Sequence, residues 1–212
     1  RQMCIRDSKQ AVQLAYDVET RETDFDNGYG WSRGCGYVVG ISVAAMFSDG
    51  HIESAYFPVD HDVQRELNLD KQIVRTFLND ILGTTTPKFG ANLQYDLGWL
   101  REFGVYPKGK HYDVQFAEAL LFPQELKALD ALGRKYVGEA KETDMLYDWI
   151  QRTYPKTAKA KLRQHIWQSP VTLVGHYAEQ DAILPLRIIQ KQWKLLYDHQ
   201  LLPVCEMECG LI

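Results

Sequence analysis

The chain has 212 residues, of which 45% are hydrophobic and 25% are charged, and its formal net charge is −4. This composition fits one globular domain, or one domain with a fragment of another, and it excludes a disordered or collagen-like chain. No run of about 18 apolar residues is present, so we expect no membrane span. The negative charge argues against broad, salt-driven coating of nucleic acid.

The four cysteines form no CxxC pair, which favours a reduced, cytoplasmic setting. Cys205 and Cys209 lie one helical turn apart, and packing explains this spacing better than metal binding does.

The first half of the chain is predicted to consist mainly of strands. Residues 1–10 lead into the first strand without periodicity or a cap, and we expect them to be disordered or not part of the natural protein. Three β-compatible runs follow, and a turn at 48–50 between the last two indicates an antiparallel hairpin. The predicted strands are Val12–Val18, Tyr37–Phe47 and His51–Val59.

The pattern then alternates between helices and short strands. Asp70 is a natural N-cap for the helix Lys71–Leu82. The further predicted elements are strands at Thr86–Gly90 and His111–Val114, and helices at Leu93–Phe103, 115–122, 126–137, 141–153, 156–168 and 175–199. Consecutive strands followed by helices that alternate with short strands predict an α/β fold, with a mixed sheet flanked by helices.

Three short motifs carry residues suited to chemistry. Asp17 and Glu19 are two apart on the first strand, so their carboxylates point to the same face, where a cation such as Mg²⁺ or Mn²⁺ would relieve their repulsion. Asn92 is placed to cap a helix, and Asp96 lies in that helix's first turn. Each motif alone is more often ordinary structure than a site.

The third motif lies on the last long helix. Tyr177 and Asp181 are four residues apart and stack on one helix face. A tyrosine hydroxyl has an ordinary pKa near 10, so that of Tyr177 is better suited to orienting a water molecule than to removing a proton. His176 lies five residues before Asp181 and is the alternative partner, as a general base.

In this order the motifs D-x-E, N-x-x-x-D and Y-x-x-x-D resemble the Exo I, Exo II and Exo III motifs of the DEDD 3′–5′ exonuclease superfamily. Thr20, the NLQYD segment at 92–96 and the YDVQFAEALLFP segment at 112–123 resemble, in particular, the proofreading domain of family A DNA polymerases. The resemblance spans about residues 12–190. It implies a ribonuclease H-like fold, with a five-stranded mixed sheet and helices on both sides.

The resemblance also implies a mechanism. A metal-dependent 3′–5′ exonuclease would release nucleoside 5′-monophosphates from DNA, using two divalent metal ions, Mg²⁺ or Mn²⁺, roughly 3.5–4 Å apart. The implied metal ligands are Asp17, Glu19, Asp96 and Asp181. Tyr177 would orient the attacking water, because the family resemblance and the helical spacing favour it over His176. The implied substrate contacts are Thr20, Asn92 and Tyr95.

Two further segments keep alternative interpretations. The basic run Arg152, Lys156, Lys159, Lys161 and Arg163 either contacts phosphates or is a solvated helix face. The glycine-rich stretch Asn27–Gly36, with Tyr29 and Trp31, is either a strand-binding flap or a long surface loop, and it departs from the short linkers of the family. The remaining histidines, His51, His61, His111 and His165, are expected to be structural.

The resemblance divides the chain into an exonuclease domain at 11–198 and, at 199–212, the truncated start of a polymerase domain. The expected partners are the single-stranded 3′ end of DNA and that polymerase domain, in a monomeric protein with no membrane contact. Two other functions stay open. One is a stand-alone, ribonuclease D-like exonuclease acting on RNA, and the other is a non-catalytic module that binds nucleic acid.

Overall fold

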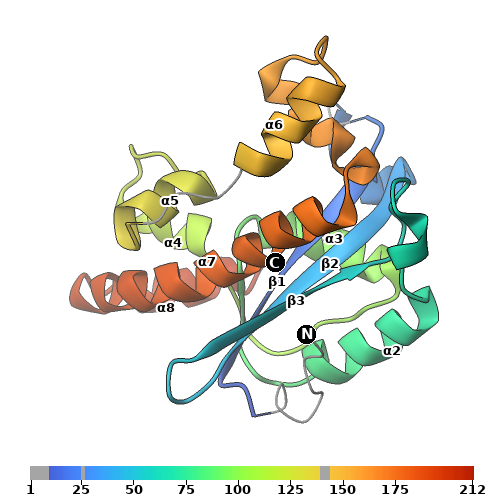
Figure 1. The fold of residues 1–212 in the computed structure, drawn as a ribbon. Coiled ribbons are helices and arrows are strands. Elements are labelled where there is room, and N and C mark those ends of the chain that lie inside the picture. The colour runs from blue at the N-terminus through green and yellow to red at the C-terminus, as the bar shows by residue number, and fades with distance from the viewer. Residues whose placement is uncertain (1–9, 25–26, 139–143) are drawn as a thin grey trace.

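Five strands form one sheet in the order β3–β2–β1–β4–β5 in a computed structural model that describes residues 10–24, 27–138 and 144–212 (Figure 1). β1 and β3 pair antiparallel with β2, whereas β4 runs parallel to both β1 and β5. The strands are β1 (Gln13–Glu22), β2 (Gly36–Met46), β3 (Ile52–Pro58), β4 (Lys88–Gly90) and β5 (His111–Asp113). The predicted α/β class with a five-stranded mixed sheet is therefore confirmed.

Helices cover both faces of the sheet (Figure 1). One face packs against α2 (Lys71–Leu82) and α3 (Leu93–Phe103). The other face packs against α7 (Val171–Asp198), together with α4 (Val114–Leu121), α5 (Leu129–Tyr136) and α8 (Leu202–Cys209). The N-terminal part of α7 also packs against α6 (Asp144–Thr153) and the 3-10 segment η4 (Lys159–Gln168). Two short 3-10 turns complete the described elements, η2 (Gly30–Arg33) and η3 (Arg65–Leu67).

Alternation along β1 decides which face carries the acids. Leu14, Tyr16 and Val18 belong to the core under α2 and α3, whereas Ala15 belongs to the core under α7. Successive side chains on a strand point to opposite faces. Asp17 and Glu19 therefore lie on the α7 face.

The first strand is longer than the sequence predicts. β1 does not end at Val18 but continues to Glu22, so the two acids lie within the strand and not at its end. The polar extension is held by pairing with β2, whose register shifts by one residue between the partners of Glu19 and Thr20. Such a bulge increases twist and redirects side chains next to a site.

Two of the helices predicted in the second half of the chain differ from the structure. The predicted helix at 156–168 is a 3-10 segment that begins at Lys159, and the predicted helix at 175–199 begins at Val171. Pro170 occupies the N-cap of α7, where a missing N–H costs nothing, whereas the sequence interpretation started the helix at Gly175. The predictions for residues 1–9 and 141–143 lie outside the described residues.

The tail folds onto the domain as α8. Cys205 and Cys209 are buried there against α4 and β5, which confirms their predicted packing role. Glu206 of this helix accepts hydrogen bonds from Lys110 (2.9 Å) and from the Tyr112 hydroxyl (3.0 Å). The assignment of 199–212 to a polymerase domain stays a prediction.

His61 has the structural role expected of it. It is 2% exposed, and its Nε2 lies 2.7 Å from the Tyr56 hydroxyl. Burial lowers the pKa of His61 to about 4, so the ring is neutral at pH 7. Among the described residues, no helix is both long and apolar enough to cross a membrane.

A buried carboxylate, Asp113, caps two helices at once. Its two oxygens accept hydrogen bonds from the backbone N–H groups of Leu93 in α3 and Gln115 in α4, each at 2.8 Å. The prediction that the Asn92 side chain caps α3 is wrong. Asn92 is in the left-handed conformation (φ 62°, ψ 43°) and makes no side-chain cap hydrogen bond. Asp113, distant in sequence, supplies this cap in its place.

Asp113→Ala is expected to destabilise the protein by about 2 kcal/mol, because each lost cap costs about 1 kcal/mol. The measurement is the free energy of unfolding by urea denaturation. Asp70→Ala is the matched control, since Asp70 caps α2 alone through the N–H of Ile73 (2.9 Å). Equal costs for the two variants would contradict the double cap.

Candidate active site

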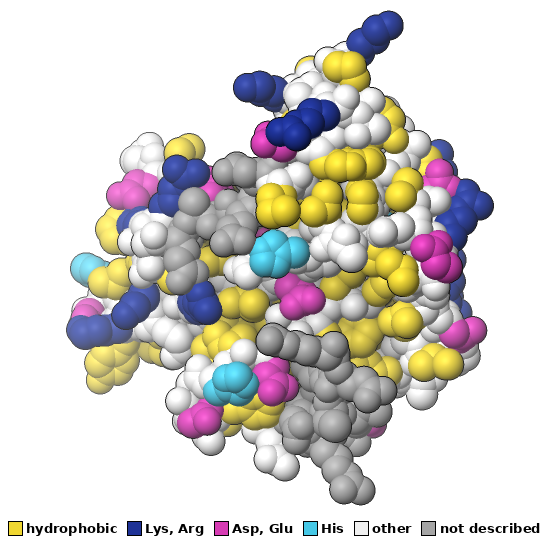
Figure 2. Space-filling model, in the orientation of Figure 1, with side chains coloured by type: hydrophobic (Ala, Val, Ile, Leu, Met, Phe, Trp, Pro, Cys, Tyr) yellow, Lys and Arg dark blue, Asp and Glu magenta, His cyan; other side chains and the backbone are white. Residues whose placement is uncertain are grey.

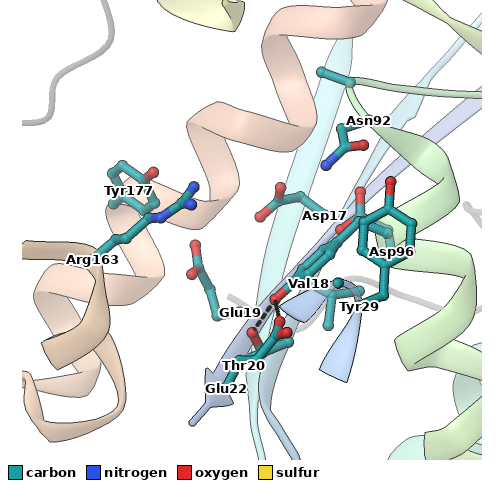
Figure 3. A pocket seen from close by; sticks show the side chains of 13 residues that line it. Asp17, Val18, Glu19, Thr20, Glu22, Tyr29, Asn92, Asp96, Arg163 and Tyr177 are labelled. Atoms are coloured by element: carbon teal, nitrogen blue, oxygen red, sulfur yellow. Dashed lines mark hydrogen bonds between the residues drawn. The ribbon is translucent and has the colours of Figure 1, made fainter. Parts of the chain in front are cut away.

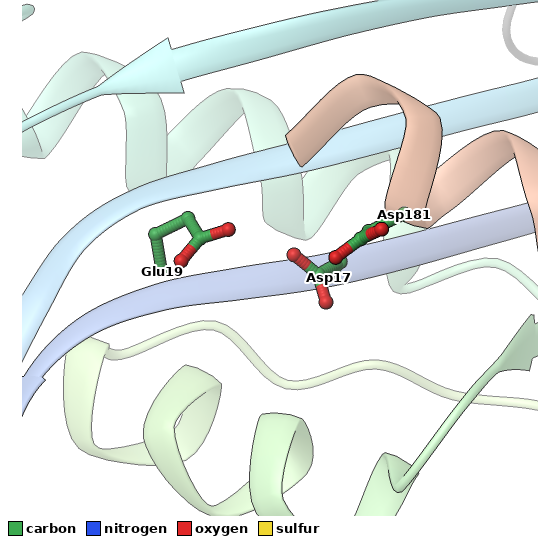
Figure 4. Close-up of side chains that lie close together, drawn as sticks. All are labelled: Asp17, Glu19 and Asp181. Atoms are coloured by element: carbon green, nitrogen blue, oxygen red, sulfur yellow. The ribbon is translucent and has the colours of Figure 1, made fainter. Parts of the chain in front are cut away.

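Three carboxylates predicted from two motifs far apart in the sequence meet on the α7 face of β1 (Figure 4). One oxygen from each of Asp17, Glu19 and Asp181 lies within 4.8 Å of the others. Glu19 and Asp181 are buried at 7% and 6% exposure, and Asp17 is half-buried. The i, i+2 spacing on β1 therefore directs both carboxylates to one side, as expected, and α7 supplies the third.

The fourth predicted acid, Asp96, approaches β1 along its edge. β4 pairs with β1 only at Leu14 and Ala15, so the edge of β1 beyond them is free for the first turn of α3. There the Asp96 carboxylate accepts a hydrogen bond from the backbone N–H of Val18. On one side of β1 the chain continues to β2, and on the other side the sheet continues with β4. In α/β sheets, ligand-binding clefts form at such points, where neighbouring connections leave the sheet in opposite directions.

Burial and like charges act together on Asp96, which is 4% exposed. They hold the pKa of this carboxyl well above its ordinary value, with burial as the first cause and the charges of Asp17, Asp113 and Glu19 adding to it. The four acids therefore form one crowded, electrostatically unfavourable group.

Three of the acids, Asp17, Glu19 and Asp96, line a cavity of about 350 Å³ (Figure 3). The sequence-predicted residues that line it are Asp17, Glu19, Thr20, Asn92, Tyr95, Asp96 and Tyr177. Asp181 joins them through its proximity to Asp17 and Glu19. The left-handed conformation of Asn92 leaves its side chain in this cavity (Figure 3). The structure thus brings all the predicted site residues together.

A chain of hydrogen bonds links two predicted substrate contacts to an unpredicted acid. The Tyr95 hydroxyl donates a hydrogen bond to the Glu22 carboxylate (2.9 Å). Because its proton is used in that bond, the Thr20 hydroxyl is the donor in the bond between Thr20 and Tyr95 (2.6 Å). Glu22 is 7% exposed and lines the cavity. The sequence interpretation missed Glu22 because it ended the strand at Val18. Glu22 also lies three residues from Glu19, and side chains at an odd spacing on a strand point to opposite faces. The spacing therefore gave no reason to group Glu22 with Asp17 and Glu19.

Tyr177 and His176 differ sharply in their surroundings. Tyr177 lines the cavity and is 9% exposed, whereas His176 is exposed on the same helix. Burial, followed by the charges of Asp181 and Glu19, raises the pKa of the Tyr177 hydroxyl well above its ordinary value. The Tyr147 hydroxyl of α6 lies 3.4 Å from it. The Tyr177 hydroxyl is therefore protonated at neutral pH.

The basic residues between Arg152 and Arg163 differ in whether they reach the cavity. Their side chains are exposed, and in Figure 2 Lys and Arg project outward over the region of α6 and η4. Arg163 alone among the five lines the cavity, and its guanidinium points into it from the side of Tyr177 (Figure 3). Lys159 and Lys161 lie on the outer surface of η4. A solvated face thus describes most of the run, and Arg163 is the exception.

The donor set fits divalent metal ions. Every candidate ligand is a carboxylate oxygen, the type that Mg²⁺ and Mn²⁺ prefer. Glu19, Asp96 and Asp181 are buried and Asp17 is half-buried, and a bound cation would offset the mutual repulsion of these acids. In the described part of the chain, Asp17, Glu19 and Asp181 are the group of acids close enough to share one ion.

The chain has a ribonuclease H-like fold with an acidic cavity on one face of its sheet. The chain superposes on NrnC of Brucella melitensis with a TM-score of 0.59 and 15% identity, over 96% of this chain and 82% of that one. It superposes on Escherichia coli RNase D, an exoribonuclease, with a TM-score of 0.61 and 17% identity, over 98% and 45%. At these identities, the likeness shows the fold.

A family model for 3′–5′ exonuclease domains of the family A DNA polymerase type matches residues 2–197. The chain belongs to this family, and it is a 3′–5′ exonuclease domain. A DNA-directed DNA polymerase of Pseudomonas phage M6 is 28% identical over 214 residues, which cover 95% of this chain. The chain spans 30% of the length of that relative.

Proposed function

We propose that this domain proofreads DNA by removing nucleoside 5′-monophosphates from a single-stranded 3′ end, as part of a family A DNA polymerase. The observation that supports it best is the meeting of Asp17, Glu19 and Asp181 within 4.8 Å beside the cavity. The phage polymerase relative supports DNA as the substrate and a polymerase domain as the partner.

We infer that Asp17, Glu19, Asp96 and Asp181 hold two divalent metal ions, Mg²⁺ or Mn²⁺. Bound ions supply an activated water at neutral pH and stabilise the charge that develops on the phosphate and on the leaving 3′ oxygen. NrnC of Brucella melitensis has been solved with bound Mg²⁺, and it shares the fold of this chain. Asp17 lies on β1 between Asp96 of α3 and Asp181 of α7, and it would hold metal together with acids on both sides of the strand.

The other cavity residues position the substrate. The protonated Tyr177 hydroxyl orients the attacking water by hydrogen bonding and removes no proton itself. The Arg163 guanidinium offers a positive charge to the scissile phosphate. Thr20, Asn92 and Tyr95 contact the terminal nucleotides from the other side of the cavity. Phosphodiester cleavage needs mainly such positioning and charge stabilisation from a protein.

The test uses a 5′-labelled single-stranded DNA oligonucleotide incubated with Mg²⁺ or Mn²⁺, with EDTA as the control. The expected result is a metal-dependent ladder that shortens from the 3′ end, with 5′-mononucleotides as products. A duplex with a mispaired 3′ terminus should be shortened faster than a paired one, because a frayed end supplies the single strand.

RNA of the same sequence is the decisive second arm. Trypanosoma brucei RNase D, which shares the fold with a TM-score of 0.62, has been solved in complex with RNA U12. Faster cleavage of RNA than of DNA would therefore favour the RNase D-like alternative. No cleavage of either substrate by a folded protein would contradict the proposed function and favour a nucleic-acid-binding role.

A further inference from the structure

The glycine-rich loop carries an aromatic side chain to the cavity. Gly28 and Tyr29 line it together with the catalytic carboxylates, although they come from a segment that follows β1 and precedes β2. Figure 3 places Tyr29 and Arg163 on different sides of the cavity. The Tyr29 ring is half-buried, and its centroid lies 5.9 Å from that of Tyr95 in an edge-on arrangement.

Tyr29 is supported from behind by Trp31. Their rings stack with centroids 6.0 Å apart and an interplanar angle of 19°. Trp31 packs in turn against α3, where a Cβ at Gly98 would lie only 2.2 Å from its indole ring. The close approach needs a residue without a side chain at this position. The glycine in α3 therefore makes room for the residue that supports Tyr29.

Hydrogen bonds to backbone carbonyls hold the loop on both sides of Tyr29. Arg33 donates to the carbonyl of Gly28 (2.9 Å), and the N–H of Cys35 donates to the carbonyl of Gly30 (2.9 Å). A Cβ at Gly30 would lie 2.7 Å from the Glu22 side chain, so the loop also lies directly against the hydrogen-bonded group of Thr20, Tyr95 and Glu22. Tyr29 is thus a fixed part of the cavity wall.

We propose that Tyr29 is a substrate-positioning residue that stacks on the nucleobase of the 3′-terminal nucleotide. The proposal rests on the exonuclease function proposed above. The acids and Arg163 form the charged part of the cavity, which suits a phosphate. The aromatic part, Tyr29 and Tyr95, suits a base. Stacking on an aromatic ring tolerates every base, as removal of successive nucleotides requires.

The test compares kcat and KM on two single-stranded oligonucleotides that differ only in the 3′-terminal nucleotide, which is thymidine or an abasic residue. Tyr29→Ala should raise KM about tenfold on thymidine, a loss typical of one stacked base, and less than about twofold on the abasic end. Tyr29→Phe should restore KM, because it keeps the ring. Tyr106→Ala, at a 58% exposed tyrosine beyond α3, is the matched control.

A purely structural role for Tyr29 would lower kcat/KM equally on both substrates, and this result would overturn the proposal, as would an unchanged KM. Circular dichroism checks that each variant folds. A second measurement separates this proposal from the exonuclease function. With 2-aminopurine at the 3′ end and EDTA present, quenching of its fluorescence by the wild type and not by Tyr29→Ala supports stacking even without cleavage. Equal quenching by both proteins overturns it.

Discussion

Asp17→Asn is expected to lower the metal-dependent rate of 3′-nucleotide removal by roughly 10³-fold, or ~4 kcal/mol of transition-state stabilisation. One carboxylate oxygen of Asp17 lies within 4.8 Å of an oxygen of Glu19 and of Asp181, and the charge of Asp17 also raises the pKa of Asp96. Asparagine keeps the shape of the side chain but removes the charge and one ligand oxygen. The rate is measured on 5′-labelled DNA across a Mg²⁺ titration.

Thermal melting gives a second readout of the same change. Mg²⁺ should raise the melting temperature of the wild type, because an ion that binds only the folded state stabilises it by about 2.7 kcal/mol at 100 times its Kd. Asp17→Asn should lose most of that increase. In EDTA the variant should be at least as stable as the wild type, since it removes one charge from a crowded acidic group.

Asp148→Asn is the matched control, because Asp148 is a 68% exposed side chain on α6. It should keep both the activity and the response to Mg²⁺. If Mg²⁺ stabilised Asp17→Asn as much as the wild type, or if that variant kept more than about a tenth of the activity, the acidic group would not be the metal site.

Tyr177→Phe is expected to lower kcat by about 10- to 100-fold, whereas His176→Ala should change it by less than about twofold. Tyr177 lines the cavity beside Asp181, and the loss of a hydroxyl that orients water costs alignment at the reacting phosphate. Phenylalanine keeps the ring that packs against Tyr147, so the fold should be preserved. His176 is exposed, and one step along a helix turns it about 100° from Tyr177.

The pH profile distinguishes the two residues independently of the size of the effect. Burial and nearby carboxylates raise the pKa of Tyr177, so its hydroxyl stays protonated at neutral pH and contributes no titration there. A histidine base would add a limb to the pH profile that disappears in His176→Ala. Such a limb, or a greater loss in His176→Ala than in Tyr177→Phe, would make His176 the residue that acts on water.

Much of this architecture could be predicted from local pattern. The five strands and most helices were expected at the right places, because alternation and helical periodicity are short-range properties. The boundaries failed where long-range contacts decide. Pairing with β2 extends β1 to Glu22, and packing between α6 and α7 stabilises a 3-10 segment where the sequence resembles an α-helix.

Spacing determined the chemistry of the site. Two acids at i, i+2 on a strand must share a face, and a tyrosine and an acid at i, i+4 on a helix must stack, whatever the rest of the fold does. The order of these motifs along the chain then indicated the exonuclease family, which the match over residues 2–197 confirms.

Tertiary structure alone decided which groups meet across the chain. Asp113 replaces Asn92 as the cap of α3, Glu22 joins Thr20 through Tyr95, and Tyr29 reaches the cavity because Gly98 admits Trp31. None of these contacts follows a sequence period, since each joins residues from different elements. Sequence spacing therefore determined the acids and the faces on which they lie only within each element. The packing of the sheet, α3 and α7 assembled them into one cavity.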